Sequence, residues 1–411
     1  MKVLNFGSCN IDYVYSLDHI VKPGETLTSD KLEIFPGGKG LNQSIAVAKG
    51  GGEVYHACCF GSDGQLLKDM LEANGVNLSL TQNTEEKSGH AIIYVGSSGE
   101  NAICVFRGAN GVISKDYIDS VLEAFETGDI LLLQNEINNI EYIIRRAYQK
   151  RMCIILNPSP ITDTLNEIDF NMLTYLILNE IEAAAITLCA EPYECLYRLK
   201  AKYPKLKVVL TLGKRGCIYS DASSEVYQPA FCADTVDTTA AGDTFTGYFV
   251  AGLLRNDDCR KILKTAAAAS AIAVTRKGAA PSIPHYKEVL GSLGNMKEYK
   301  NSESRKDIFL SEVNRYIDAN LKSANISELS DKLGYSTTYV SKQITALTGR
   351  SFSENLQDKR CTAAAALLIN TELGISQVIK EVGYENETYF RKIFKRKYGK
   401  NPLEYRKSAV R

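Results

Sequence analysis

The sequence predicts a chain of two parts, in which a large α/β unit with a doubly wound sheet is followed by a smaller all-α unit. Three observations support this expectation. The chain has 411 residues, which is more than one ordinary domain needs. Short apolar segments alternate with longer helical segments through residues 1–294, and residues 308–411 repeat a helix–turn–helix pattern. The polar segment 295–307 between them is typical of a linker.

The two parts of the chain, which meet near residue 304, carry net charges of opposite sign. The whole chain has 48 Lys and Arg against 48 Asp and Glu. Residues 305–411 carry 19 basic and 12 acidic side chains, a balance of +7, so residues 1–304 carry 29 and 36, a balance of −7. A basic segment indicates contact with a polyanion, although a solvated basic surface has the same composition.

The composition is that of a globular protein, with 45% hydrophobic and 23% charged residues. No apolar run approaches the ~20 residues that a membrane helix needs, so we expect no contact with a membrane. The first residues, MKVLNFGSCNID, do not resemble a signal peptide. The 11 cysteines are scattered, without a CxxC pair or a Cys/His cluster along the sequence. This pattern predicts reduced, cytoplasmic thiols and argues against a disulfide scaffold and a structural zinc site.

The first part alternates between segments typical of strands and segments typical of helices. Apolar, β-branched segments predict strands at residues 2–6, 91–95, 130–133, 153–156 and 208–212. Longer segments predict helices at residues 41–50, 66–74, 140–150 and 262–274. This alternation predicts a largely parallel sheet covered on both faces, with ligands bound beyond the carboxyl ends of its strands.

Residues 237–247 (DTTAAGDTFTG) form the strongest functional motif. The small residues Ala240, Ala241 and Gly242 precede a helix expected to begin at Asp243. Free N–H groups at the start of a helix bind anions. Asp243 could simply cap this helix. Alternatively, it removes a proton from a substrate hydroxyl while the amides hold the charge of a transferring phosphate. The run of small residues favours the second interpretation, because a cap does not need it.

Residues 35–43 (FPGGKGLNQ) predict a turn that leads into a helix. Glycines allow the backbone to approach a polyhydroxylated ligand closely, and Lys39 and Asn42 offer hydrogen-bond donors. The alternative is an ordinary loop. The segment matches neither the P-loop nor the dinucleotide-binding pattern, so both of those interpretations fail.

Three further segments follow expected strands. Asp12, two residues after Asn10, can accept two sugar hydroxyls at a strand end, or it can simply form a turn. In residues 179–182 (NEIE), an acid near phosphates can hold Mg²⁺ through water. Residues 211–216 (TLGKRG) offer a glycine-bounded turn that can border a nucleotide.

In this order, these segments resemble the ribokinase-like carbohydrate kinase (PfkB) family over about residues 2–294. The matching stretches include GGKGLNQ, GDILLLQNE, ILNPSP, NEIEA, TLGKRG, DTTAAGDTFTG and RKGAAPSIP. They resemble the ribokinase branch more than the fructokinase or adenosine kinase branches. The resemblance implies phosphorylation of D-ribose by ATP to D-ribose 5-phosphate, and a homodimer formed through a small β-lid around residues 27–35.

The resemblance also implies a role for each matched residue. Asp243 is the base, and the amides of Ala240, Ala241 and Gly242 form the anion hole. The residues expected around the sugar are Asn10, Asp12, Gly38, Lys39, Gly40, Asn42, Glu136 and Asp243. The residues expected near ATP are Asn179, Thr211, Gly213, Lys214, Gly216 and Gly242. Glu182 would place Mg²⁺ through water. The expected K⁺ ligands are Asp237, Thr239 and Ser282 with the carbonyls of Ala273, Arg276 and Gly278.

The tail is an internal repeat. Residues 325–327 recur in outline as 374–376, and Gly334-Tyr335 recurs as Gly383-Tyr384, both 49 residues further on. Each copy predicts a helix, a tight turn and a second helix, at residues 327–333, 337–347, 376–382 and 387–398. The last helix has one apolar face, expected to be buried, which consists of Phe390, Ile393, Phe394 and Tyr398. Its other face suits DNA, although a solvated amphipathic helix remains the alternative. The duplication and the basic balance favour DNA.

Residues 308–407 resemble the AraC/XylS-type DNA-binding domain, most specifically through the ending GISQVIKEVGYENETYFRKIFKRKYGKNPLEYRK. The resemblance implies two recognition helices, joined by a long helix at residues 352–369, that enter two successive major grooves of double-stranded DNA. The candidate contacts in the first copy are Ser336, Thr337, Thr338, Ser341 and Lys342. Those in the second copy are Asn386, Glu387, Thr388, Arg391, Lys392 and Lys395.

Three functional hypotheses follow. In the first, a working pentose kinase is fused to a DNA-binding module that regulates genes of pentose use. In the second, the chain is a transcription regulator whose kinase fold only senses a sugar or nucleotide, without turnover. In the third, the two parts are not coupled. The first hypothesis explains why Asp243 and the small residues before it are present, because a sensor needs neither a base nor an anion hole.

Overall fold

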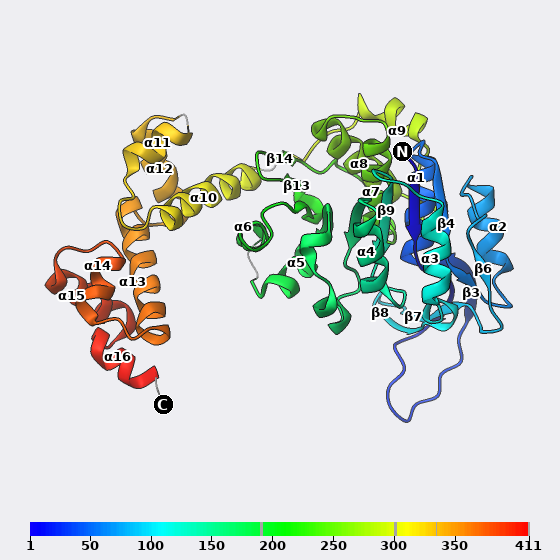
Figure 1. Cartoon of the computed structure of the whole chain (residues 1–411), viewed down its shortest axis with the longest axis horizontal. Coiled ribbons are helices and arrows are strands. Elements are labelled where there is room, and N and C mark those ends of the chain that lie inside the picture. Colours follow the sequence, from blue (N-terminus) through cyan, green and yellow to red (C-terminus); the bar gives the residue numbers. More distant parts are fainter. Residues whose placement is uncertain (190–191, 300–301, 334, 410–411) are drawn as a thin grey trace. The chain divides into compact units, whose positions relative to one another are not determined.

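The computed structural model describes residues 1–189, 192–299, 302–333 and 335–409 (Figure 1). The chain forms two compact units, Met1–Lys300 and Asn301–Arg411. In the described part of the chain, no helix combines the length and the apolar character needed to cross a membrane.

The first unit is built on an eight-stranded sheet in the order β14-β13-β12-β11-β10-β9-β1-β4. Its strands are β1 (Val3–Phe6), β4 (Val54–Ala57), β9 (Ile130–Gln134), β10 (Cys153–Asn157), β11 (Tyr175–Asn179), β12 (Lys207–Thr211), β13 (Cys217–Ser220) and β14 (Glu225–Gln228). The pairs from β4 to β12 are parallel, and β13 and β14 add an antiparallel edge. The predicted doubly wound, largely parallel sheet is therefore confirmed.

Helices cover both faces of this sheet, because its strands are apolar on both faces. In β9, Ile130 and Leu132 join the core beneath the helices α1 (Lys39–Lys49), α7 (Ala241–Leu254) and α8 (Cys259–Ala273). Leu131 and Leu133 alternate with them and face the opposite side. The helices of that side are α3 (Lys115–Glu123), α4 (Ile140–Gln149), α5 (Glu180–Thr187) and α6 (Pro192–Lys202). The remaining α-helices among the described residues of this unit are α2 (Gln65–Ala73) and α9 (Tyr286–Leu293).

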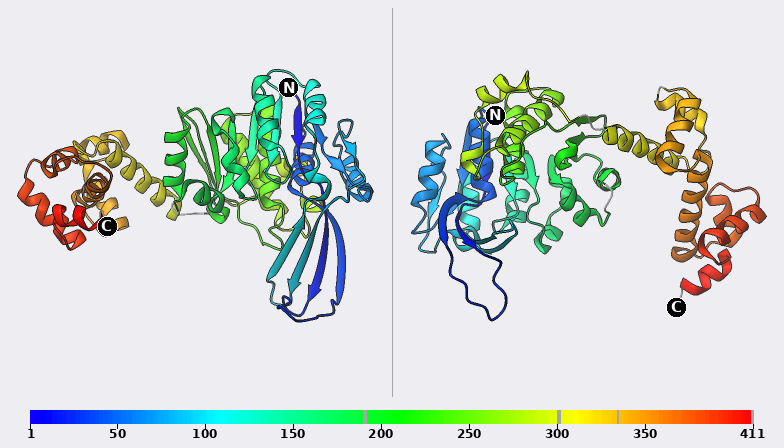
Figure 2. Two further views of the ribbon diagram at one scale, coloured as in Figure 1. Left: turned by 60° about the horizontal axis from the view of Figure 1, so that its bottom comes forward. Right: turned by 180° about the vertical axis from the view of Figure 1, so that it is seen from behind.

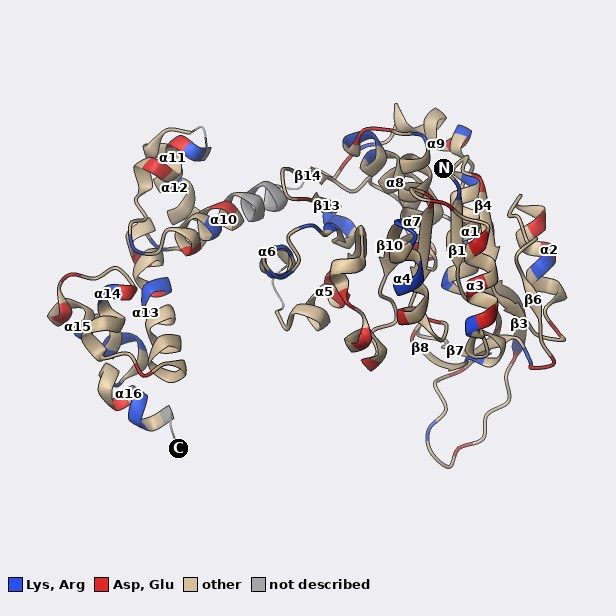
Figure 3. Ribbon diagram, viewed as in Figure 1, with Lys and Arg blue, Asp and Glu red and all other residues tan. Residues whose placement is uncertain are grey.

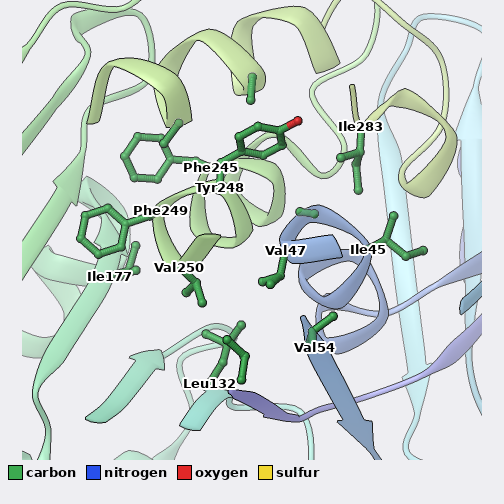
Figure 4. Packing of buried hydrophobic residues seen from close by; sticks show 14 of the residues in the cluster. Ile45, Val47, Val54, Leu132, Ile177, Phe245, Tyr248, Phe249, Val250 and Ile283 are labelled. Atoms are coloured by element: carbon green, nitrogen blue, oxygen red, sulfur yellow. The ribbon is translucent and has the colours of Figure 1, made fainter. Parts of the chain in front are cut away.

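The contact between α1 and α7 is close-packed (Figure 4). Phe245, Tyr248 and Phe249 of α7 belong to the same buried cluster as Ile45 and Val47 of α1. These apolar side chains fix the register of the two helices that carry the candidate site.

A second, four-stranded sheet forms a lid in the order β3-β2-β7-β8. Its strands are β2 (Asn10–Leu17), β3 (Lys31–Gly37), β7 (Gly89–Gly96) and β8 (Asn101–Phe106), and they project from the unit in the left view of Figure 2. Residues 91–95 were expected in the main sheet but lie in β7, because the period-two pattern that predicts a strand does not tell which sheet the strand joins. A short pair, β5 (Cys59–Phe60) and β6 (Gln82–Asn83), completes the strands.

In its described residues, the second unit contains helices and no strands. Its helices are α10 (Ser302–Ala319), α11 (Ile326–Leu333), α12 (Thr337–Thr348), α13 (Phe352–Asn370), α14 (Ile375–Glu381), α15 (Glu387–Tyr398) and α16 (Pro402–Ala409). Each copy of the repeat has its own core, and α13 contributes to both cores. Phe390, Ile393 and Phe394 are buried and Tyr398 is half-buried, which confirms the predicted face of α15. The turn expected at Gly334 lies outside the described residues.

Part of the segment expected as a linker has defined structure. The amide of Cys232 donates to the carbonyl of Lys297 at 2.8 Å, and the amide of Tyr299 donates to Ala230 at 2.8 Å. These backbone hydrogen bonds attach residues 297–299 to the first unit. Helix α10 then begins at Ser302.

The α1–α7 contact predicts a position where even one methyl group is too large. A Cβ atom on Gly247 would lie 2.3 Å from Cβ of Ala46 and 2.8 Å from the carbonyl oxygen of Gln43. We expect Gly247→Ala to lower the free energy of unfolding by about 1–3 kcal/mol, because the helices must separate. The matched control is Gly291→Ala in α9, where a Cβ meets nothing within 4 Å and alanine favours the helix. Thermal unfolding measures both variants, and equal effects would contradict the prediction.

Candidate active site and DNA-binding surface

Asp243 lies in the first turn of α7 and points toward α1. The residue is 6% exposed, and its carboxylate accepts hydrogen bonds from Nδ2 of Asn42 at 3.0 Å and Nε2 of Gln43 at 2.9 Å. In the described part of the chain, it accepts none from the backbone of its own helix. Asp243 is therefore not a helix cap, and its partners fix the carboxylate at the start of α7.

The small residues before Asp243 leave part of the backbone open. Ala240 is in the left-handed conformation, with φ of 60°, which turns the chain into the helix. The amide of Ala241 donates to the carbonyl of Thr238 at 3.2 Å, so one of the three expected anion-hole amides is engaged. Among the described residues, the amides of Ala240 and Gly242 have no acceptor. A Cβ on Gly242 would meet nothing within 4 Å, so open space adjoins this amide.

A buried polar network fixes the side chain of Gln43 and, through it, the carboxylate of Asp243. Nε2 of Gln43 also donates to Oδ1 of Asn157 at 3.1 Å, and its Oε1 accepts from Nε2 of Gln134 at 2.7 Å. Gln134 and Asn157 are the last residues of β9 and β10, and they are opposite each other in the sheet. Sequence reasoning gave these three residues no role, although a polar residue that ends an apolar strand (ILLLQ, IILN) was a visible signal.

Glu136 and Lys39 are two half-buried ionisable residues near Asp243. Glu136 accepts from the amide of Lys39 at 3.0 Å and from the hydroxyl of Ser8. Burial raises the pKa of Glu136 above its usual value despite these hydrogen bonds. Burial lowers the pKa of Lys39, but the carboxylates of Asp243, Glu136 and Glu182 outweigh it, so the pKa lies above its usual value. Lys39 is therefore a cation held among acidic groups.

Asn10 and Asp12 lie at the start of β2 rather than in the turn after β1. Burial, assisted by the charge of Glu136, raises the pKa of Asp12 to about 7. Oδ2 of Asp12 would lie 2.1 Å from a Cβ on Gly37, which explains the glycine there. Oδ1 of Asn10 accepts from Nδ2 of Asn110 at 2.8 Å, and Asn110 is a supporting residue that the sequence analysis missed.

The two glycines expected to approach the ligand have different roles in the backbone. Gly38 precedes α1 with φ of 96°, a conformation that favours glycine. A Cβ on Gly40 would lie 2.3 Å from the amide nitrogen of Ser8, so Gly40 allows α1 to pack against the turn after β1.

The residues expected at ATP lie at the ends of β11 and β12. Asn179 and Glu182 form a capping box at the start of α5, in which each side chain accepts from the other's amide at 2.9 Å. Nδ2 of Asn179 and the second oxygen of Glu182 take no part in this cap. Thr211 ends β12, and the turn of Gly213, Lys214 and Gly216 follows it, with φ of 55° at Gly213 and 97° at Gly216.

The residues expected to bind K⁺ come from two segments that the structure brings together. Oδ2 of Asp237 accepts from the amide of Gly278 at 3.0 Å, and Oδ1 accepts from the amide and hydroxyl of Thr239. The buried hydroxyl of Ser282 donates to Ala279 in the same loop, and the amide of Arg276 donates to the carbonyl of Ala273 at 3.0 Å. One carboxylate among hydroxyls and carbonyls is a donor set that fits a hard cation.

In the second unit, Thr337, Thr338 and Lys342 of α12 are exposed, as are Thr388, Arg391, Lys392 and Lys395 of α15. Ser341 and Glu387 are half-buried. Ser336 and Asn386 occupy the same position in the two copies, where each side chain caps the helix by accepting from the amide three residues on. Figure 3 shows basic segments on α15 and α16.

Comparisons with known proteins agree with this geometry. The model of the pfkB family carbohydrate kinases matches residues 1–286, and a helix-turn-helix domain model matches residues 329–408. The ribokinase of Haemophilus influenzae is 34% identical over 293 residues, which cover 69% of this chain and 95% of the relative. The ribokinase of Bacillus subtilis is 34% identical over 290 residues, covering 69% and 96%.

A solved structure, Arabidopsis thaliana ribokinase complexed with ribose and ATP, superposes with a TM-score of 0.64 at 30% identity. The match covers 71% of this chain and 98% of that chain. Fold, site and comparisons together define a sugar-phosphorylating enzyme with an appended AraC-type helix-turn-helix domain. The chain belongs to the pfkB family of carbohydrate kinases.

The raised pKa of Asp12 predicts that the free energy of unfolding depends on pH. Between the ordinary pKa of an aspartate and about pH 7, the folded chain holds a proton that the unfolded chain has lost, so stability falls as the pH rises through this range. Asp12→Asn removes this loss of stability. We expect the variant to gain on the order of 1 kcal/mol of unfolding free energy over wild type at about pH 8, and less at about pH 5. Urea unfolding at both pH values measures the gain.

The control for this prediction is Asp18→Asn, on an exposed side chain just beyond the same strand. That variant should show no comparable difference between the two pH values. A gain for Asp12→Asn that is larger at the lower pH would contradict the assigned burial of Asp12.

Proposed function

We propose that the first unit transfers the γ-phosphoryl group of ATP to the 5-hydroxyl of D-ribose, giving D-ribose 5-phosphate and ADP. The observation that carries the proposal is the buried carboxylate of Asp243, held by Asn42 and Gln43 next to the open amide of Gly242. A base beside an unoccupied N–H group at a helix start is the arrangement that phosphoryl transfer to an alcohol requires.

In the proposed mechanism, the oxygen of the sugar 5-hydroxyl attacks the γ-phosphorus, and Asp243 accepts the proton of that hydroxyl. The O–P bond to the sugar forms while the bond to the β-phosphate bridging oxygen breaks, and ADP leaves with that electron pair. The amides of Ala240 and Gly242 and the positive end of α7 stabilise the charge on the transferring group. Asn42 and Gln43 keep the carboxylate in one orientation, which supplies the alignment that this reaction mainly needs.

Two cations are part of this proposal. Mg²⁺ would neutralise charge on the phosphates of ATP, and Glu182 is the acid we assign to its water shell. K⁺ would occupy the loop pair of Asp237 and Gly278. Because this loop leads directly into Ala240, its ligands also fix the backbone that forms the anion hole.

The unpaired polar groups near Asp243 support a polyhydroxylated substrate. Oδ1 of Asn42 is buried without a hydrogen-bond partner among the described residues. Leaving such an acceptor unpaired costs about 1–3 kcal/mol, and because solvent does not reach this atom, a sugar hydroxyl can donate to it only after neighbouring side chains shift. The carboxylate of Asp12 can accept two further hydroxyls, and Lys39 can donate to a ring or hydroxyl oxygen. Ribose is the pentose we assign because the ribokinase relatives share this unit.

The lid supports a homodimer. Strands β2, β3, β7 and β8 place Leu32, Ile34 and Phe106 on one face, where they are 47%, 49% and 52% exposed. An apolar face of this kind is typical of a protein–protein contact. A second copy of the lid is the partner that we assign to it.

We further propose that the second unit binds double-stranded DNA and that sugar binding changes its affinity for DNA. The exposed polar and basic side chains of α12 and α15 support DNA binding, because they lie on the faces opposite the two cores. Coupling between sugar and DNA would correspond to about 1–3 kcal/mol of free energy.

The kinase proposal predicts how replacing the Asp243 carboxylate with an amide affects kcat. We expect Asp243→Asn to lower kcat with ribose by about 10²–10⁴-fold, because the amide cannot accept the proton. ATP consumption across a panel of pentoses, with and without K⁺, measures this effect and the preferred sugar. The control is Asp234→Asn, on an exposed acid of the preceding loop, which should keep full activity.

Turnover by Asp243→Asn equal to wild type would contradict the role of the base. A wild-type chain that consumes no ATP with any pentose, but whose affinity for DNA responds to a sugar, would instead support a sensor without catalysis. DNA affinity indifferent to ribose, ATP and ribose 5-phosphate would contradict the coupling alone.

The DNA-binding proposal predicts a steep dependence on salt. Each Lys or Arg that neutralises a phosphate releases a counterion, so log Kd should rise linearly with log salt concentration. We expect Lys392→Ala to weaken binding to all duplexes and to reduce the slope by about 1. The control is Lys264→Ala, on an exposed position of α8 in the first unit. Fluorescence anisotropy with a labelled duplex measures both, and a slope unchanged by Lys392→Ala or a flat salt response would contradict the assignment.

A further inference from the structure

Two cysteines and a histidine, none of them assigned to catalysis or substrate binding, meet in the core of the first unit. Cys9 lies between β1 and β2, His56 in β4 and Cys58 just after β4. Sγ of Cys9 is 3.2 Å from Nε2 of His56 and 3.9 Å from Sγ of Cys58. The three donor atoms all lie within 4.8 Å of one another, and the residues are at most 2% exposed. The fold thus assembles a Cys/His cluster that the sequence spacing did not predict.

The sheet explains why these residues meet. Strands β1 and β4 are parallel neighbours, with Asn5 opposite His56. Their following residues leave the same end of the sheet, which brings Cys9 next to Cys58. A separation of 47 residues between Cys9 and His56 hides this proximity in the sequence.

The imidazole is oriented by a second set of hydrogen bonds. Nδ1 of His56 shares a hydrogen bond of 2.8 Å with Oγ of Ser44, and the same oxygen accepts from Nδ2 of Asn5 at 2.8 Å. With its proton on Nδ1, the ring turns the lone pair of Nε2 toward the two sulfur atoms. A histidine that binds a metal is typically held through its other nitrogen in this way.

Apolar side chains pack around much of the cluster, while Asn110 and Tyr117 bond to the backbone of Cys9 and Cys58. Cys9 and Cys58 belong to the buried cluster that includes Leu41, Ile45 and Phe60. Polar groups buried in such a place are costly unless they are paired or bind a metal. Cysteines bind metals as thiolates, so binding of a metal would release the thiol protons.

We propose that Cys9, His56 and Cys58 bind one Zn²⁺ ion. Two sulfur atoms 3.9 Å apart can both lie at the usual Zn–S distance of about 2.3 Å, with an angle of about 116° at the metal, close to tetrahedral. Two thiolates and one imidazole are a donor set that zinc accepts with a fourth, non-protein ligand such as water. The ion would tie the turn between β1 and β2 to β4. That turn carries Ser8 and Asn10 on either side of Cys9. The ion would therefore stabilise the backbone that places Asn10 in the candidate sugar site.

The test is a metal analysis of the full chain, purified without a polyhistidine tag. The protein is reduced, incubated with Zn²⁺ and dialysed against excess Mg²⁺ to clear oxygen-ligand sites. We expect about one zinc per chain by mass spectrometry. Co²⁺ in place of Zn²⁺ should give thiolate-to-metal charge-transfer absorption, which reports sulfur ligands directly and does not depend on kinase activity.

Cys58→Ser is the test variant, and Cys59→Ser is its matched control. Cys59 is the neighbouring cysteine, is also buried and has its Sγ 4.0 Å from Oε1 of Gln82, outside the cluster. We expect Cys58→Ser to lose at least tenfold in zinc content and the charge-transfer band, and Cys59→Ser to keep both. Where Cys58→Ser does not fold, His56→Gln provides the same comparison.

Three outcomes would overturn the proposal. The first is a reconstituted wild-type chain without zinc and without the cobalt band. The second is equal zinc in Cys58→Ser and Cys59→Ser. The third is a disulfide between Cys9 and Cys58 in the reduced and reconstituted protein, detected by peptide mass analysis, which would identify the cluster as a redox pair instead.

Discussion

The candidate active site depends on one hydrogen bond between helices, from Nε2 of Gln43 in α1 to Oδ1 of Asp243 in α7. A buried carboxylate is costly unless hydrogen bonds stabilise it, and here Asn42 and Gln43 supply them. Gln43 is itself fixed by Gln134 and Asn157 at the carboxyl ends of two central strands. The orientation of the Asp243 carboxylate is therefore set by the main sheet and not by its own helix.

Close packing makes that hydrogen bond available. Gly247 allows α7 to approach α1 so nearly that Ala46 and the backbone of Gln43 occupy the space a side chain would need. Gly40 does the same between α1 and the turn after β1. In both places the missing side chain lets two elements pack closely together. The polar groups of the site are thereby brought within hydrogen-bonding range.

The sequence predicts much of this arrangement, because strand–helix alternation and the DTTAAGDTFTG and GGKGLNQ motifs are local patterns. The sheet and the turn before α1 follow from them, and the duplicated helices follow from the repeat in the tail. Helix α7 was expected to begin at Asp243, but it begins two residues earlier, at Ala241. The sequence could not predict that residues 91–95 join the lid, since one strand pattern serves either sheet. It also missed Gln134 and Asn157, whose role depends on strand neighbours, and the meeting of Cys9 with His56, which depends on parallel pairing of distant strands.

The energetics of the site also distinguish between catalysis and sensing. A pocket that only binds sugar needs hydroxyl acceptors such as Asp12. It does not need Asp243, a buried acid that two side-chain amides hold in place. The Asp243 arrangement removes a charge from water and leaves Oδ1 of Asn42 unpaired, both of which cost stability. Function is the usual compensation for such a local cost. A chain that had kept only the sensing role would gain stability by losing Asp243, so its presence in this setting favours an enzyme that still turns over, with the DNA-binding domain as its second activity.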